Sequence, residues 1–469
     1  MSSRQRKKVK TAKQEGANGH TKAEAKESKA AAPVGESQPV QYCKDSEVIL
    51  IRYDDLVAGK DLSDSIDIAY GENGLGILAV EGVPNFVKLR QDLLPLAHRF
   101  ANLPAETKAK YEHPQSQYSF GWSHGKENLG DKPDYAKGSY YNNPIFDKPF
   151  EDQTIIEKYA SFAHPNIWPT ADLPALEPAF KAMGTTVVDT GLLLAKHLDS
   201  FVKKRVPSYP ESRLTNIIKD CRTVKARLLH YFPRPDLAAA QGAAVDEAVT
   251  KANESKADGS KPKENAKRQT RSSKRKSAND EEVPERPQSP KKSKKDSEEE
   301  TYATWCGWHN DHGSLTGLVP GMFLDADGKV VPSPDPASGL YIKNRKGKII
   351  KGTLPLDCLA FQMGESQQVH SGGALQATPH AIRGPAPGKA GDGLSRQSFA
   401  VFMEPMWGER MDIPKGTKKE KAQKGSSSKF LPKAVPPLSQ RWEPSMDFGE
   451  FTAETLKCYT VIGGGGLNM

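Results

Sequence analysis

The sequence predicts a mainly β fold with flanking α-helices, and three features of its pattern support this class. After Thr301, short apolar segments alternate with Gly/Pro turns, a spacing typical of an all-β sandwich or barrel. Before residue 237, apolar residues recur at both helical and strand spacings, so helices and further strands should accompany the β core. Residues 1–41 and 237–300 contain few large apolar residues, and we expect them to be disordered.

Before residue 237, we expect three strands and three helices. Short apolar runs bounded by turn residues predict the strands, and apolar residues spaced by three and four predict the helices. The strands are expected at 47–53, 74–84 and 224–233, and the helices at 87–100, 103–111 and 180–202. Residues 118–144 are rich in Gly, aromatic and polar residues, and are expected to form long loops with some strand that cover a pocket.

After residue 301, the same reasoning predicts a series of short strands. They are expected at 302–308, 314–319, 339–343, 348–351, 357–362, 374–383 and 395–404. The Lys/Ser-rich stretch 415–429 is expected to be a surface loop.

The charge of the chain is concentrated in the two tracts that are expected to be disordered. The formal net charge of the 469 residues is +9. Residues 1–41 carry nine basic and four acidic residues, residues 251–300 carry fifteen and eleven, and the remainder balances at 43 of each. We therefore do not expect the folded core to bind nucleic acid or another polyanion.

The cysteines and the hydropathy favour an intracellular protein. Five scattered cysteines form no Cys-x-x-Cys pair, which argues against a disulfide framework and fits a reducing compartment. No apolar run approaches the roughly 18–20 residues that span a membrane, and no apolar signal-peptide core follows the first residues. The chain is expected in the nucleus or the cytoplasm, without a membrane partner.

His309 and Asp311 form the first candidate chemical pair. Because strand side chains alternate, residues two apart leave the same face of an extended strand. A neutral imidazole beside a carboxylate supplies two ligands of a 2-His-1-carboxylate iron site, which leaves positions open for a co-substrate and dioxygen. His312 would point to the opposite face from Asp311 and is not expected to be a ligand.

The third ligand should come from a later strand, and two histidines qualify. His380 lies in an apolar, strand-like segment, whereas His370 precedes Ser371 and two glycines in a turn-like setting. These settings leave both histidines open, and the preference for His380 comes largely from the resemblance described below.

Arg396 and Ser398 form a candidate carboxylate site. The two side chains share one face of the strand expected at 395–404. Bidentate pairing of a guanidinium with a carboxylate supplies both charge and orientation, so a buried Arg beside a hydroxyl suits a small dicarboxylate. The alternative for Arg396 is a side chain that reaches solvent from the end of a strand.

Three segments together resemble a known family. Residues 309–318 are similar to the His-x-Asp-x-Gly-x-Leu-Thr-x-Leu signature of ferrous, 2-oxoglutarate-dependent oxygenases related to isopenicillin N synthase. Residues 371–380 resemble the segment that carries the family's distal histidine, and residues 396–398 resemble its Arg-x-Ser motif.

The resemblance extends upstream and implies a fold. Residues 76–84 and 100–108 are similar to the family's N-terminal region, so the resemblance covers residues 47–236 and 301–410. It implies a double-stranded β-helix (jelly-roll) core with an N-terminal α/β region, interrupted in this chain by the long disordered insertion.

The resemblance also implies a role for each candidate. His309, Asp311 and His380 would bind Fe(II), while Arg396 and Ser398 would hold the distal carboxylate of the co-substrate 2-oxoglutarate. Ascorbate is a further candidate cofactor.

Four aromatic residues are candidates for weaker roles. Tyr231 lies in a segment similar to the family's Arg-x-x-x-Tyr-x-Pro and is a candidate co-substrate contact, with core filling as the alternative. Tyr118, Phe120 and Trp122 lie in the loop region that often lines the substrate channel in this family. Core packing is the alternative for each of them.

Six segments follow from these observations. They are a disordered basic tail (1–41), an N-terminal oxygenase region (42–150), helical support with the first core strands (151–236), a disordered charged insertion (237–300), an Fe(II)/2-oxoglutarate oxygenase core (301–410) and a C-terminal extension (411–469).

The function implied is oxidation of a small organic substrate, by hydroxylation or related C–H chemistry, coupled to oxidative decarboxylation of 2-oxoglutarate. The alternatives are a nuclear oxygenase acting on a protein or nucleic acid, and a non-catalytic scaffold on the same fold. Phe402 stands where the nucleic-acid demethylase branch would carry a second Arg. An idle site would have no need of a buried Asp beside two histidines.

Two basic clusters within residues 274–295 resemble a bipartite nuclear-localisation signal. The expected partners are therefore a small-molecule substrate and, through this tract, the nuclear import machinery. Solubilising charge is the alternative role of the tract.

Overall fold

The computed structural model describes residues 39–461 apart from residues 127, 130–131, 234–298, 300, 387, 390–392, 428 and 430. The disorder expected for residues 1–38, 237–298 and 300 therefore lies outside the described residues, as does the basic tract 274–295. The disorder expected up to residue 41 is wrong for Gln41, because this residue belongs to strand β1 (Gln41–Tyr42), which pairs with β2 (Ile49–Arg52). Among the described residues, no helix has the length and apolar character needed to cross a membrane.

Eight antiparallel strands in two sheets form the core, and they confirm the expected jelly-roll architecture. The large sheet contains the order β14-β10-β16-β8, and the small sheet has the order β13-β12-β15-β9. The eight strands are β8 (Lys225–Tyr231), β9 (Cys306–His309), β10 (Leu315–Leu324), β12 (Gly339–Lys343), β13 (Ile349–Lys351), β14 (Leu359–Met363), β15 (His380–Arg383) and β16 (Ser395–Met403). The short strands expected after residue 301 account for all of these except β8, which was expected at 224–233.

The N-terminal region extends the large sheet at both edges. On one side β3 (Ile77–Glu81) pairs with β14 and lies parallel to β2. On the other side β7 (Lys137–Asn142) pairs with β8, and β4 (Gly121–His124) pairs with β7. The remaining short strands are β5 (Asn128–Leu129), β6 (Lys132–Pro133) and β11 (Val330–Val331), and the short N-terminal helices are α1 (Tyr53–Val57), α2 (Ser63–Tyr70) and α4 (Ala105–Ala109).

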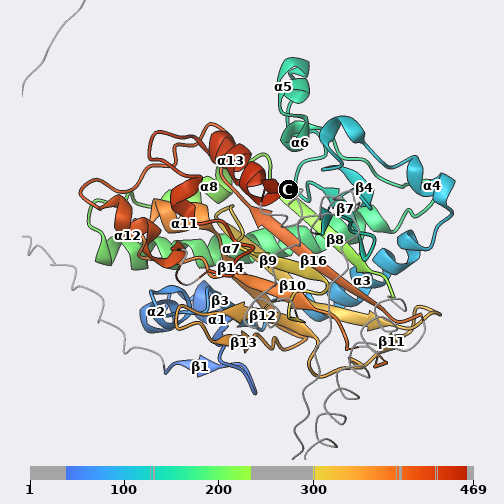
Figure 1. Ribbon diagram of the computed structural model, residues 1–469, viewed down its shortest axis with the longest axis horizontal. Helices are drawn as coiled ribbons and strands as arrows, with labels where there is room; N and C mark the ends of the chain where they lie inside the picture. The colour runs from blue at the N-terminus through green and yellow to red at the C-terminus, as the bar shows by residue number, and fades with distance from the viewer. Residues whose placement is uncertain are drawn as a thin grey trace, which may run out of the picture. The chain divides into compact units, whose positions relative to one another are not determined.

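Helices α3 (Phe86–Ala101) and α7 (Leu176–Arg205) pack on one face of the large sheet, as Figure 1 shows for α7. Their apolar stripes bury large side chains such as Phe100 and Phe180 against the sheet. This agrees with the helical periodicity, although both helices extend beyond the expected bounds. The helices leave the opposite face of the large sheet turned toward the interior of the jelly roll.

Helix α7 packs tightly on β10 at Gly317. A Cβ added there would lie 2.1 Å from Cγ1 of Val187 on α7. We expect Gly317→Ala to lower the free energy of unfolding by about 1–3 kcal/mol, because overpacking forces the helix and sheet apart. Chemical denaturation of Gly317→Ala, Val187→Ala and the double variant measures this. The double variant should lose less than the sum of the single losses, and simple additivity would contradict the contact.

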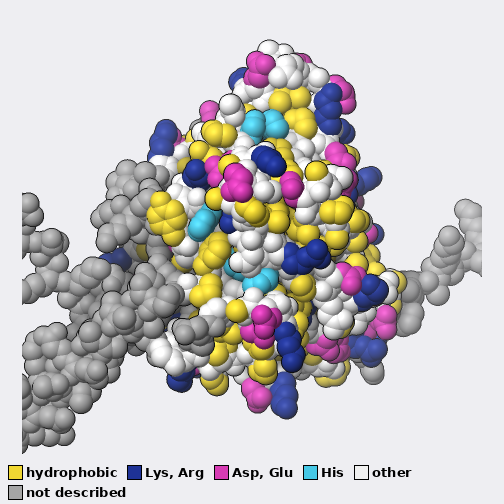
Figure 2. Space-filling view, turned by 90° about the vertical axis from the view of Figure 1, so that its right-hand side faces the viewer, with side chains coloured by type: hydrophobic (Ala, Val, Ile, Leu, Met, Phe, Trp, Pro, Cys, Tyr) yellow, Lys and Arg dark blue, Asp and Glu magenta, His cyan; other side chains and the backbone are white. Residues whose placement is uncertain are grey.

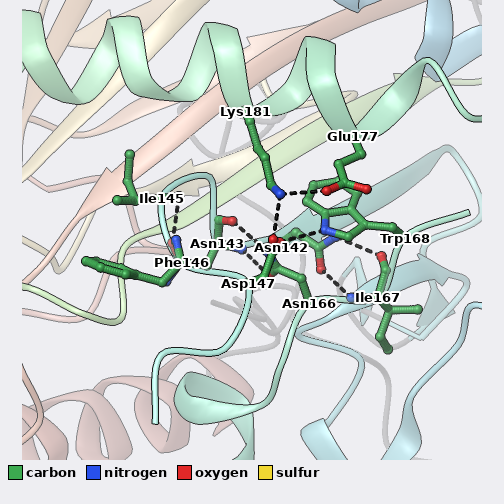
Figure 3. Close-up of polar contacts among 10 residues, drawn as sticks. All are labelled: Asn142, Asn143, Ile145, Phe146, Asp147, Asn166, Ile167, Trp168, Glu177 and Lys181. Carbon is green, nitrogen blue, oxygen red and sulfur yellow. Dashed lines mark hydrogen bonds and ion pairs between the residues drawn. The ribbon is translucent and has the colours of Figure 1, made fainter. Parts of the chain in front are cut away.

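The segment between β7 and α7 leaves the sheet and returns beside its starting point (Figure 3). It carries α5 (Gln153–Lys158) and α6 (Ala160–Ala163). At its base, the side-chain amide of Asn166 donates to the backbone carbonyl of Asn143 at 2.7 Å. The backbone N–H of Asn143 donates in turn to Oδ1 of Asn166 at 2.8 Å. Asp147 accepts from the Trp168 indole at 2.8 Å and from Lys181 of α7 at 2.6 Å. These contacts fix both ends of the segment to the body.

The strand expected at 374–383 is mostly wrong. The strand expected at 374–383 begins only at His380, and α11 (Glu365–His370) precedes it. Every residue of α11 is buried, so this helix lacks the polar and apolar faces that make a helix visible in a sequence.

The stretch 415–429, expected to be a surface loop, is partly buried. It contains α12 (Lys419–Gln423), and both Ala422 and Ser426 are buried. The amide of Gln368 on α11 donates to the Ala422 carbonyl at 2.7 Å and to Ser426 Oγ at 3.2 Å. The backbone of this Lys-rich stretch therefore covers α11, a role that its composition does not reveal.

The C-terminal segment packs against α11 through an apolar cluster. Its last described element is α13 (Phe448–Val461). The buried residues of the cluster are Val369, Met411, Ala422, Leu438, Trp442, Phe448 and Phe451. On the face shown in Figure 2, basic and acidic side chains are intermingled, in keeping with the balanced charge of the chain outside its two basic tracts.

Candidate active site

His309, Asp311 and His380 lie together where β9 and β15 pair. The register places His380 opposite His309, and Asp311 follows two residues after the end of β9. Nε2 of His309 lies 3.6 Å from Oδ1 of Asp311, and Nε2 of His380 lies 3.7 Å from the same oxygen. One ligand atom from each residue lies within 4.8 Å of the others. This spacing can hold a single metal ion from one side.

The Nδ1 nitrogens of both histidines face backbone carbonyls. Nδ1 of His309 lies 2.8 Å from the Gly307 carbonyl, and Nδ1 of His380 lies 3.3 Å from the Thr378 carbonyl. An Nδ1–H that donates to a carbonyl leaves the lone pair of Nε2 for a metal. Oδ2 of Asp311 is buried without a hydrogen-bond partner. The donor set therefore fits a divalent iron of the 2-His-1-carboxylate type.

The two histidines differ in their protonation. Burial, followed by the neighbouring His309, lowers the pKa of His380 to about 4, so His380 is a neutral imidazole at pH 7. Burial acts to lower the pKa of His309, but the Cys306 sulfur and the Asp311 carboxylate outweigh it and raise that pKa to about 9. The anionic neighbours of His309 therefore favour a positive charge at its position.

Arg396 lies on β16, which pairs with β10 on one side and with β8 on the other. It is opposite Tyr231 of β8, and its guanidinium carbon lies 5.2 Å from the Tyr231 ring centroid. Nη1 of Arg396 is buried without a hydrogen-bond partner. Ser398 shares the same face of β16. A half-buried guanidinium with one buried, unused donor is suited to a carboxylate brought in by a ligand.

A pocket of about 310 Å³ connects these groups. It is lined by all of the predicted metal and co-substrate residues, namely Tyr231, His309, Asp311, His380, Arg396 and Ser398. The pocket thus brings together residues that the sequence places as far apart as β8 and β16.

Tyr231 fits both of its expected roles. Its ring stacks on Trp305 at 5.0 Å between centroids, within a small buried cluster, and it also lines the pocket. Burial raises the pKa of the Tyr231 phenol, which therefore stays protonated at neutral pH.

Tyr118, Phe120 and Trp122 are not among the residues that line this pocket. Trp122 pairs with Tyr140 across β4 and β7, so it lies on the helix-covered face of the sheet, where its ring contacts Phe100 at 5.2 Å. Phe120 is buried beneath the Lys225 ammonium, 4.9 Å from its ring centroid. Tyr118 is half-buried beside Lys126.

The two other candidate histidines lie apart from the cluster. His312 stacks on Phe448 at 5.5 Å between centroids, and burial lowers its pKa to about 3. His370 is the last residue of α11 rather than part of a turn, and its Nε2 lies 3.1 Å from the Arg410 carbonyl. Neither belongs to the group with metal-binding spacing found among the described residues.

Some residues of the site were missed in the sequence. Cys306 lines the pocket, with Sγ 3.9 Å from Nδ1 of His309. Arg227 also lines it, and its position four residues before Tyr231 on one strand was a usable signal. Asn310, between the two ligands, donates through its side chain to Glu365 at 2.8 Å. Nothing local in the sequence marks that contact.

Comparisons with known proteins concern the N-terminal region and the fold of this chain. Residues 48–171 match the family described as "non-haem dioxygenase in morphine synthesis N-terminal". No curated protein sequence matches the chain.

Solved structures are similar over most of the chain. A protein of Caulobacter crescentus described as of the 2OG-Fe(II) oxygenase family is 16% identical, with a TM-score of 0.53 over 88% of this chain and 99% of that chain. A full-length protein of Neurospora crassa, solved in complex with alpha-KG and 5-formyluracil, is 16% identical, with a TM-score of 0.52 over 90% and 99%. At these identities the likeness establishes the fold.

Proposed function

We propose that this chain, which has the fold of the 2-oxoglutarate/Fe(II) dioxygenase superfamily, is itself an Fe(II)- and 2-oxoglutarate-dependent dioxygenase of a small organic substrate. One observation carries the proposal: the His309/Asp311/His380 cluster and the partly unpaired guanidinium of Arg396 line the same pocket. A metal site alone would fit many proteins, whereas its combination with a buried carboxylate anchor fits a chelating dicarboxylate co-substrate.

The residues divide the work of binding between them. His309, Asp311 and His380 hold iron from one side, and Arg396 with Ser398 receives the distal carboxylate of 2-oxoglutarate. Bound iron supplies the redox chemistry with dioxygen by which 2-oxoglutarate becomes succinate and carbon dioxide while the substrate is oxidised. The apolar pocket walls exclude bulk water from the reacting groups.

A small substrate is supported by the dimensions of the pocket. Its volume of about 310 Å³ lies at the lower end of the about 300–1,000 Å³ of small-molecule sites. Structures of the Neurospora crassa protein, which has the same fold, contain thymine or 5-formyluracil. The proposed location is the nucleus or the cytoplasm, with the nucleus supported by the basic tract 274–295 of the sequence.

Anaerobic absorption spectroscopy tests this proposal. Adding Fe(II) and 2-oxoglutarate to the purified chain is expected to give a weak visible charge-transfer band, because 2-oxoglutarate chelates the iron. Admitting air should then yield succinate. A chain that shows neither the band nor succinate is not a dioxygenase of this type.

A further inference from the structure

Strand β10 is interrupted directly beside the guanidinium of Arg396. Its pairing with β16 shifts register between Val319 and Met322, so Pro320 and Gly321 form a bulge. A bulge leaves backbone groups outside the sheet ladder and changes the direction of the strand. The carbonyls of Pro320 and Gly321 need partners from elsewhere in the molecule.

Gly321 makes room for the guanidinium. A Cβ added to Gly321 would lie 2.4 Å from Nε and 2.7 Å from Cζ of Arg396. Arg396 therefore rests against the bare backbone of the bulge on one side and faces Tyr231 on the other. The path of the bulge decides where this guanidinium can lie.

Arg90 of α3 holds the bulge in place. Its Nε donates to the Pro320 carbonyl at 2.9 Å, and its Nη2 donates to the Gly321 carbonyl at 2.6 Å. Arg90 is only 7% exposed, although it belongs to a helix on the far side of the sheet from the pocket. Two charged donors on successive carbonyls fix both the position and the orientation of the bulge.

Arg90 and Arg396 also share an electrostatic environment. Burial first, and then the charge of Arg396, lowers the pKa of Arg90 to about 10, so both side chains are cationic at pH 7. At Arg396, burial lowers the pKa of the guanidinium, while the neighbouring Tyr231 and Cys306 act to raise it. The buried charge of Arg90 and the half-buried charge of Arg396 favour an anion near them.

We propose that Arg90 is a positioning residue for the distal carboxylate of 2-oxoglutarate, acting through the Pro320–Gly321 bulge and Arg396. This inference rests on the proposed function. Arg90 sets how tightly the pocket binds a five-carbon 2-oxo diacid, and it adds little to the binding of a 2-oxo acid that lacks the distal carboxylate.

The test compares two ligands on three variants. Binding of 2-oxoglutarate and of 2-oxopentanoate to the Mn(II)-loaded chain is measured by calorimetry. Arg90→Gln is expected to weaken the binding of 2-oxoglutarate about ten-fold, as the loss of a side chain that supports a ligand-binding residue does. The affinity for 2-oxopentanoate should stay within about two-fold, since that acid makes no contact with Arg396. Arg99→Gln, at an exposed position of the same helix, should change neither affinity.

Arg90→Lys guards against loss of folding in Arg90→Gln. Lysine keeps the positive charge but lacks the planar fork that reaches the carbonyls of both Pro320 and Gly321. The affinity of Arg90→Lys for 2-oxoglutarate should therefore lie between those of the wild type and Arg90→Gln. In turnover, the KM for 2-oxoglutarate should rise with little change in kcat. Equal weakening of both acids, or an unchanged affinity for 2-oxoglutarate in Arg90→Gln and Arg90→Lys, would overturn the inference. A wild-type chain that fails to bind 2-oxoglutarate overturns the proposed function itself.

Discussion

Asp311→Ala is expected to abolish metal binding and the turnover of 2-oxoglutarate. The variant removes the only carboxylate of the cluster and leaves two histidines, one of which has an Nε2 3.6 Å from the lost oxygen. Loss of a partner of a metal ligand costs about 10–100-fold, so loss of a ligand should weaken Fe(II) binding by at least that factor. Competition with a metal-sensitive dye and assay of succinate measure the two losses.

A matched control separates loss of the site from loss of the fold. His164 is half-buried outside the cluster, so His164→Gln should retain metal binding and turnover. His309→Ala and His380→Ala should behave as Asp311→Ala does, with unchanged circular dichroism. If Asp311→Ala kept wild-type affinity for Fe(II), the ligand assignment would be wrong.

Arg441→Met is expected to cause the largest loss of stability. Arg441 Nη2 lies 2.6 Å from Glu365 Oε1, and both side chains are fully buried. Removing the cation leaves a buried carboxylate without its partner, which costs about 3–5 kcal/mol. The free energy of unfolding in urea measures this, with a lower midpoint at an unchanged slope.

The double variant Glu365→Gln/Arg441→Met is the control. It removes both charges, so it should be more stable than Arg441→Met alone. A loss below about 1 kcal/mol in Arg441→Met would instead match an exposed ion pair. Glu365 also accepts from Asn310, and the Asn310 amide N–H donates to the Tyr459 hydroxyl at 3.1 Å. Glu365 thus connects Arg441 to Asn310, which lies between two of the metal-binding residues. Arg441→Met should therefore also weaken the binding of Fe(II).

The core strands and the metal cluster could be predicted because their signals are local. The two-residue spacing of His309 and Asp311 marks the pair, although β9 ends at His309 and Asp311 lies beyond it, and the motif around His380 supplies the third position. The structure adds the pairing of β9 with β15, which makes these separate segments adjacent. Short apolar runs between turns mark strands wherever one face is buried.

The missed features depend on contacts that are remote in the sequence. Helix α11 is buried on all sides, and its polar side chains bond to backbone and side-chain groups of other segments, so no periodicity marks it. Arg90 reads as one more charge on a helix, although its partners lie 230 residues away. Trp122 was a candidate substrate contact because of its loop, but its face of the strand follows only from the pairing of β4 with β7.

Crystals soaked with Mn(II) and 2-oxoglutarate under anaerobic conditions would test the central claim most directly. Anomalous scattering is expected to show a peak about 2.0–2.3 Å from Nε2 of His309, a carboxylate oxygen of Asp311 and Nε2 of His380. Density for 2-oxoglutarate should run from that peak to the guanidinium of Arg396. A metal peak elsewhere, or a dicarboxylate that does not reach Arg396, would contradict the account.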